Sequence, residues 1–98
     1  MFMTVYDEPQ ATADADELDV RQIPKPQRHP MIFARFDALA AGDSFVLVNS
    51  HDPLHLREEF ARERPGAYAW RYLEGSTSDR LWRIRIVRIT EPDVGGAR

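Results

Sequence analysis

The sequence predicts an α/β domain with the element order β-α-β-α-β-β, and three observations lead to this prediction. Short apolar, strand-like runs alternate with two segments whose apolar residues have the 3.6-residue period of amphipathic helices. Prolines and glycines separate these segments where turns are needed. The last two runs alternate between apolar and polar residues around a short polar linker, which predicts an antiparallel hairpin.

The length and composition limit the class of protein. A chain of 98 residues forms one domain at most, and 43% hydrophobic residues are enough for a modest core. The absence of cysteine excludes disulfides, thiolate–metal ligation and cysteine chemistry. No apolar run approaches the roughly 20 residues of a membrane span, and no signal-peptide pattern is present. We therefore expect a soluble, cytoplasmic protein without a membrane partner.

Both ends of the chain are expected to lie outside the folded domain. Residues 1–16 have no sustained period and are rich in acids, which predicts a disordered acidic tail. Residues 90–98 contain proline and glycines and are expected to form a flexible C-terminal tail. The domain is thus expected over residues 17–89, and the sequence does not reveal a role for the acidic tail.

The first strand and the first helix are separated by prolines. A short alternating run over residues 17–21 predicts a strand with Leu18 and Val20 facing inward. Residues 23–26 contain two prolines, and we expect them to exclude both strand and helix. The helix should then have Pro30 in its first turn and Gly42 as its C-terminal cap. Its expected apolar face consists of Ile32, Phe33, Phe36, Leu39 and Ala40.

The second strand and the second helix follow directly. Residues 45–49 are almost continuously apolar, as in a central strand. Asp52 is the expected N-cap of the next helix, with Pro53 at its first position. Leu56 and Phe60 form an apolar pair four residues apart, and the Pro65–Gly66 pair ends the helix.

The final hairpin has two different faces. Tyr68, Trp70 and Tyr72 share one face of the first strand, and the polar linker covers residues 75–79. Aromatic and basic residues on one face would suit single-stranded nucleic acid. Alternation places the aromatic residues and most arginines on opposite faces, so nucleic-acid binding is disfavoured. We expect the face formed by Trp82, Ile84 and Ile86 to pack under the helices.

Several motifs together resemble a known fold family. The N-terminal strand, the proline pair before the first helix, the Gly42–Ser44 turn and the Asp-Pro before the second helix resemble TusA/SirA-type sulfur-carrier domains. Residues 17–89 resemble more closely an uncharacterised bacterial branch of that fold, some of whose members lie beside hemerythrin-like domains. The motifs that carry this closer resemblance are Arg28-His29-Pro30, Phe36-Asp37-Ala38-Leu39, Leu47-Val48-Asn49, His51-Asp52-Pro53, Arg64-Pro65-Gly66 and Trp82-Arg83-Ile84-Arg85-Ile86.

The resemblance implies a two-layer α/β sandwich, in which both helices cover one face of a four-stranded mixed sheet. The sulfur carriers have a reactive cysteine just before the first helix, and this chain has residues 24–28 (PKPQR) there. Because a persulfide needs a thiol, sulfur transfer by that mechanism is excluded.

The three histidines of the chain are predicted to meet at one edge of the sheet. Parallel strands one and two, joined through a helix, would end on the same edge, where open α/β sheets commonly bind ligands. This edge would also collect two helix N-termini, which favour anions. We therefore predict a site for a small ligand or a protein partner there. Its candidate residues are Arg28, His29, His51, Asp52 and His55.

A divalent-metal site is the alternative interpretation of the same edge. Zinc and iron use imidazole and carboxylate ligands, and the available ones are His29, His51, Asp52 and His55. The spacing does not match a firm metal motif. Under this interpretation, the protein is a metal-binding or redox-accessory protein.

The sequence contains no convincing catalytic constellation. It has no thiol, no glycine-rich phosphate loop and no serine in a nucleophile-elbow context. The preferred interpretation is therefore a non-enzymatic binding or accessory domain, with a pure protein-docking module as a further alternative. The identity of the ligand, partner or pathway, and the oligomeric state, do not follow from the sequence.

Overall fold

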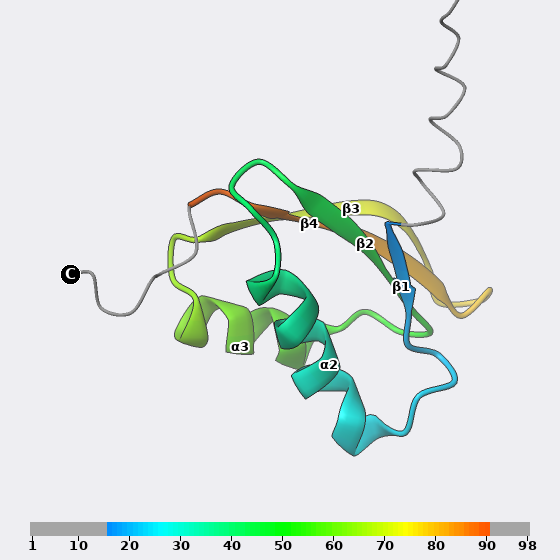
Figure 1. Cartoon of the computed structure of the whole chain (residues 1–98). Coiled ribbons are helices and arrows are strands. Elements are labelled where there is room, and N and C mark those ends of the chain that lie inside the picture. The colour runs from blue at the N-terminus through cyan, green and yellow to red at the C-terminus, as the bar shows by residue number, and fades with distance from the viewer. Residues whose placement is uncertain (1–15, 91–98) are drawn as a thin grey trace, which may run out of the picture.

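The structure, a computed structural model, describes residues 16–90. The predictions for the two tails therefore fall outside the described residues, apart from Asp16 and Thr90. Within this range the element order is β-α-β-α-β-β, as predicted (Figure 1). The elements are β1 (Glu17–Asp19), α2 (Lys25–Asp37), β2 (Ser44–Asn49), α3 (Leu54–Glu63), β3 (Tyr68–Ser76) and β4 (Leu81–Arg88).

The four strands form one mixed sheet in the order β1-β2-β4-β3. β1 and β2 are parallel, whereas β4 is antiparallel to both of its neighbours, β2 and β3. The carboxyl ends of β1 and β2 therefore lie at the same edge, as the sequence predicted. Each of these two strands continues from that edge into a helix (Figure 1).

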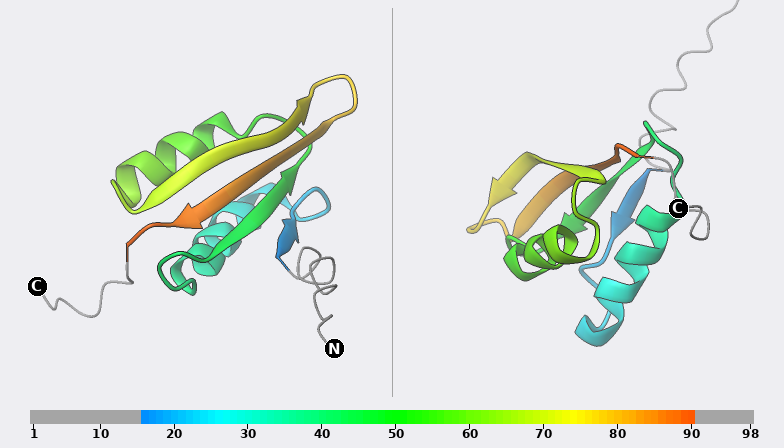
Figure 2. Two further views of the ribbon diagram at one scale, coloured as in Figure 1. Left: turned by 90° about the horizontal axis from the view of Figure 1, so that it is seen from above. Right: turned by 90° about the vertical axis from the view of Figure 1, so that its left-hand side faces the viewer.

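Both helices cover the same face of the sheet, which makes the domain a two-layer sandwich (Figures 1 and 2). Viewed from above, α3 lies on the side of β3, and α2 lies on the side of β1 and β2 (Figure 2). No helix among the described residues is long and apolar enough to cross a membrane.

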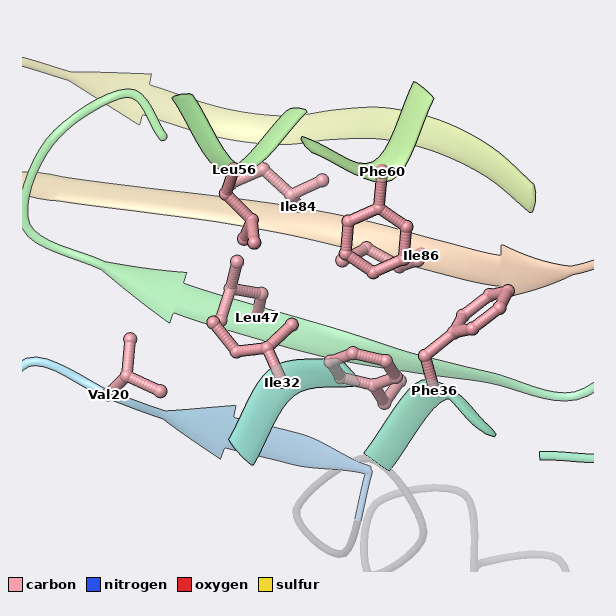
Figure 3. Close-up of a cluster of buried hydrophobic side chains, with 9 residues drawn as sticks. Val20, Ile32, Phe36, Leu47, Leu56, Phe60, Ile84 and Ile86 are labelled. Carbon is pink, nitrogen blue, oxygen red and sulfur yellow. The ribbon is translucent and has the colours of Figure 1, made fainter. Parts of the chain in front are cut away.

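The core fills the space between the sheet and the helices (Figure 3). Alternation along the strands supplies one side of it, and the helices contribute residues at three- and four-residue spacings. Phe60 is fully buried, and its ring contacts those of Phe33 and Phe36 at centroid distances of 4.4 and 5.2 Å. The cluster consists of Val20, Ile32, Phe36, Phe45, Leu47, Leu56, Phe60, Ile84 and Ile86.

The predicted bounds of the first helix were wrong at both ends. α2 begins at Lys25 with Pro24 as its N-cap, so Pro26 lies in the first turn and Pro30 lies inside the helix. A proline in the first turn removes no hydrogen bond, because backbone N–H groups there have no partner within the helix. Pro30 removes one interior hydrogen bond, and the burial of Ile32 and Phe36 compensates for that loss. The helix ends at Asp37.

Gly42 belongs to the turn before β2 and does not cap the helix. The C-cap of α2 is Ala38, whereas Gly42 has a φ of 92°, a left-handed conformation that favours glycine. Its N–H donates to the carbonyl of Arg88 at 2.7 Å, and the N–H of Arg88 donates to Asp43 at 2.8 Å. The turn therefore joins the start of β2 to the end of β4.

The hairpin has the two faces that were predicted. Ile84 and Ile86 are fully buried under the helices, and Trp82 packs against the same cluster. β3 extends further than expected, into the predicted linker, so that Gly75 lies within β3 and faces Trp82 across the ladder. A Cβ on Gly75 would overlap the Trp82 ring, which explains the need for glycine at this position.

On the opposite face of the sheet, charged side chains link neighbouring strands and strands further apart. Arg83 of β4 forms an ion pair with Glu17 of β1 at 2.5 Å, across the intervening β2. Arg85 donates a hydrogen bond to the Ser44 hydroxyl at 2.8 Å. These arginines are thus bonded within the domain, in agreement with the expectation that they cover the outer sheet.

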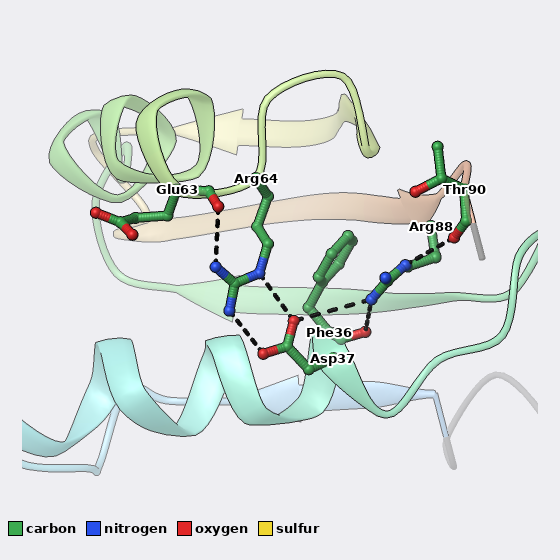
Figure 4. Close-up of polar contacts among 6 residues, drawn as sticks. All are labelled: Phe36, Asp37, Glu63, Arg64, Arg88 and Thr90. Atoms are coloured by element: carbon green, nitrogen blue, oxygen red, sulfur yellow. Dashed lines mark hydrogen bonds and ion pairs between the residues drawn. The ribbon is translucent and has the colours of Figure 1, made fainter. Parts of the chain in front are cut away.

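The C-terminal ends of the two helices are joined by an ionic cluster (Figure 4). Arg64, the C-cap of α3, donates to both carboxylate oxygens of Asp37 at 2.9 and 2.7 Å. Arg88 is 5% exposed, lies 4.8 Å from the Phe36 ring centre and donates to the Thr90 carbonyl at 2.8 Å. Cations at helix C-termini interact favourably with the helix dipoles.

Candidate functional site

A cavity of about 450 Å³ lies at the edge of the sheet where β1 and β2 end. Its size falls within the range of small-molecule sites in proteins. All five residues predicted for the site, Arg28, His29, His51, Asp52 and His55, line this cavity. The structure thus brings the predicted residues together, and their role in binding stays a prediction.

The starts of α2 and α3 both contribute to the cavity wall. Lys25 is the first residue of α2, and Leu54 is the first residue of α3; both line the cavity. Neither helix has a side-chain cap or an acidic residue in its first turn. The leading backbone N–H groups of a helix carry partial positive charge, and among the described residues no side chain caps them at these two helix starts.

Asp52 does not cap α3 as predicted. The N-cap is Pro53, and the Oδ1 atom of Asp52 instead accepts a hydrogen bond from the Tyr72 hydroxyl at 2.7 Å. The reason lies in the hairpin, because the long β3 carries Tyr72 within reach of the carboxylate. Arg57 lies over the same tyrosine ring, 5.7 Å from its centre. Asp52 therefore fixes one wall of the cavity against β3.

His29 links the two helices. It was expected at the start of the helix, but it is the fifth residue of α2, because the helix begins earlier. Its Nδ1 atom lies 2.6 Å from the Oε1 atom of Glu59 on α3. One ring nitrogen is thus engaged by a carboxylate, which orients the imidazole beside the cavity.

Arg28 holds the loop between β1 and α2. Its Nε atom donates to the Ile23 carbonyl at 2.7 Å, and one terminal nitrogen lies 3.4 Å from the Arg21 carbonyl. A guanidinium has five N–H donors, so these two contacts leave further donors available. Arg28 therefore positions the loop and also contributes positive charge to the cavity.

The electrostatic environment of His51 is positive. Partial burial lowers the pKa of His51 below its ordinary value of 6.5, and Lys25 and Arg28 lower it further. Asp52 acts in the opposite direction but more weakly. The ring is therefore neutral at pH 7 and can donate or accept a hydrogen bond.

Asn49 is a cavity residue that the sequence analysis missed. It is the last residue of β2 and follows Phe45 and Leu47 in the inward alternation, so its side chain is on the helix-covered face. Asn49 is 5% exposed, lines the cavity, and its Oδ1 atom has no hydrogen-bond partner among the described residues. A buried acceptor without a donor costs roughly 1–3 kcal/mol. The signal in the sequence that could have identified Asn49 is a polar residue at an inward-facing position of an otherwise apolar strand.

Lys25 is the second residue that was missed. The sequence predicts neither strand nor helix over residues 23–26, and this prediction is wrong for Lys25, which starts α2. Lys25 lies between two prolines in the sequence, and Pro24 at the N-cap places it in the first turn of α2.

The arrangement does not form a ready metal centre. Within residues 16–90, no three histidine, aspartate or glutamate side chains form a group that could hold a metal ion. The structure offers a reason, since Glu59 engages His29 and Tyr72 engages Asp52. The divalent-metal alternative therefore has no preformed ligand set in this part of the chain.

Comparison with known proteins identifies the family. Residues 17–88 match the family described as Uncharacterized conserved protein (DUF2249). The chain belongs to this family. The match covers every helix and strand of the described domain, including the cavity. No curated protein and no solved structure gave a significant match.

Proposed function

We propose that this domain binds a small anionic ligand in the cavity at the edge formed by β1 and β2. One observation carries the proposal: two uncapped helix starts and two cationic side chains, Lys25 and Arg28, surround the same cavity. Helix N-termini and cations favour anions for the same electrostatic reason. The neutral His51 ring adds a hydrogen-bonding group to this wall.

The proposal describes a binding domain and not a sulfur carrier. The element order and the helix start that follows β1 support a scaffold shared with TusA/SirA-type domains. The chain has no cysteine, so no persulfide can form on it. In this proposal, the site next to the first helix is used to bind an anion without covalent chemistry.

An NMR titration tests the proposal. We would follow the backbone amide signals of the ¹⁵N-labelled protein while adding acetate, hexanoate, inorganic phosphate or Zn²⁺ in separate experiments. We expect at least one anion to shift the signals of residues 25–29 and 49–56 in a saturable way. The Zn²⁺ experiment tests the metal alternative, for which saturable shifts at the histidines are the expected sign.

Two variants and a matched control make this test specific. Lys25→Gln should weaken anion binding about threefold to tenfold, because it removes a full charge from the cavity. His51→Ala should weaken the response, because one hydrogen-bonding group is lost, and should leave the fold largely intact, because His51 is an exposed residue. Arg62→Gln removes an exposed cation from the last turn of α3, outside the cavity lining, and should change nothing. Equal weakening by Lys25→Gln and Arg62→Gln would contradict the proposal.

A further inference from the structure

We infer that the ligand is an organic acid with a single negative charge, an apolar body and a hydrogen-bond donor on that body. This inference rests on the proposed function and adds the chemical class of the ligand. Three properties of the cavity carry it: its net charge, its apolar wall, and the unpartnered amide of Asn49.

The charge of the lining selects a monoanion. Among the lining residues other than histidine, Lys25 and Arg28 are positive and Asp52 is negative, which leaves an excess of one positive charge. Part of Arg28 is already bonded to backbone carbonyls. A carboxylate carries the single charge that this lining balances, whereas a phosphate group carries close to two at pH 7.

The apolar wall requires an organic body. Five of the residues that line the cavity are apolar, and Leu54 among them is 54% exposed. An inorganic ion at the helix starts would leave this surface against water, whereas an alkyl group would cover it. The five residues are Val20, Ile32, Pro53, Leu54 and Leu56.

Asn49 indicates a polar group on that body. Three buried polar side-chain atoms lack a partner among the described residues, and two of them are the indole N–H groups of Trp70 and Trp82. The third, Oδ1 of Asn49, is the one that belongs to a cavity-lining residue. The Oδ1 atom has almost no accessible surface, so a ligand reaches it when the amide rotates by about 180° and exchanges the positions of its oxygen and its NH₂ group. A ligand hydroxyl or amide would supply the missing donor.

Matched probes separate the three properties. We would measure dissociation constants by NMR for hexanoate, 3-hydroxyhexanoate and inorganic phosphate. We expect 3-hydroxyhexanoate to bind about tenfold more tightly than hexanoate, because one buried hydrogen bond is gained. Phosphate should bind more weakly than either carboxylate, because it leaves the apolar wall uncovered.

The variant Asn49→Val tests the role of the amide directly. Valine suits a strand and removes the polar group, so the fold should be retained. Its backbone spectrum and urea unfolding curve would check this retention. We expect Asn49→Val to bind hexanoate as the unmodified chain does and to lose the preference for the hydroxylated acid. If valine at this position unfolds the domain, Asn49→Ser provides the same comparison with a shorter polar group, and the preference should fall about threefold.

The outcomes distinguish this inference from the proposed function. If neither carboxylate nor phosphate shifts the cavity residues, the proposed function fails and the inference fails with it. If phosphate binds best, or if the hydroxyl preference is absent or survives Asn49→Val, the inference fails and anion binding remains.

Discussion

The two ends of the helix pair differ in how their charges are arranged. At the C-terminal ends of α2 and α3, Asp37 accepts two hydrogen bonds from Arg64, and Arg88 is buried beside it (Figure 4). At the N-terminal ends, neither helix has a side-chain cap or an acidic residue in its first turn, and the first residues of both helices line the cavity. We call the first end, where Arg64 and Arg88 lie beside Asp37, the closed end. We call the second end, where Lys25 and Arg28 line the cavity, the open end. We expect the closed end to contribute stability, and we propose that the open end binds a ligand.

The largest effect on stability is expected at the closed end. Asp37→Ala should lower the free energy of unfolding by about 1–2 kcal/mol, because Arg64 loses a bidentate partner and the buried Arg88 loses a nearby carboxylate. Urea unfolding followed by circular dichroism measures this loss. Anion binding at the other end of the helices should not change.

Glu63→Ala is the matched control for this end. Glu63 is exposed, and its carboxylate lies 3.7 Å from the Nε atom of Arg62, so its removal should change stability by less than about 0.5 kcal/mol. A loss for Glu63→Ala as large as that for Asp37→Ala would mean that net charge, and not the Asp37 cluster, determines stability here.

A smaller effect is expected for Asp52 at the open end. Asp52→Ala should cost about 1 kcal/mol, because the hydrogen bond from Tyr72 is lost. Tyr72→Phe removes the same bond and keeps the ring beneath Arg57, so it should cost a similar amount. The two changes together should not be additive in urea unfolding experiments. A cost for Asp52→Ala alone, with none for Tyr72→Phe, would instead support a capping role for Asp52.

Part of the fold and of the candidate site could be predicted from the sequence. Apolar periodicity identified the core, because burial of Phe36, Phe60 and Ile86 depends on spacing alone. The parallel pairing of β1 and β2 brought the histidines to one edge, and this also followed from element order. Both predictions depend on features that repeat along the chain.

Contacts between distant segments could not be predicted in this way. The hydrogen bond between Asp52 and Tyr72 depends on how far β3 extends, and the long β3 was not foreseen. The start of α2 was missed because proline is unfavourable inside a helix but acceptable in its first turn. Asn49 was missed because a polar residue at a strand end usually signals only the end of the strand.

The smallest expected effect concerns the pH dependence of the open end. The pKa of His51 is lower in the folded chain than its ordinary value of 6.5, because burial and the charges of Lys25 and Arg28 disfavour protonation. Just below pH 6.5, the unfolded chain therefore binds more protons than the folded chain, and stability decreases as the pH falls. His51→Gln should reduce this decrease, measured by urea unfolding at about pH 7.5 and 5.5. The difference should be small, because solvent screens the exposed ring.

A bound anion should change the titration of His51 in the opposite direction. A carboxylate beside Lys25 and Arg28 would offset their charge, so the pKa of His51 should rise toward or above its ordinary value. NMR titration of the imidazole ring protons, with and without saturating hexanoate, measures this shift. The rings of His29 and His55 line the same cavity, and Glu59 already bonds the former, so all three should be assigned through single histidine variants. An unchanged His51 pKa at saturation would mean that the anion binds away from the cationic wall, and the contrast between the two helix ends would then lose its functional meaning.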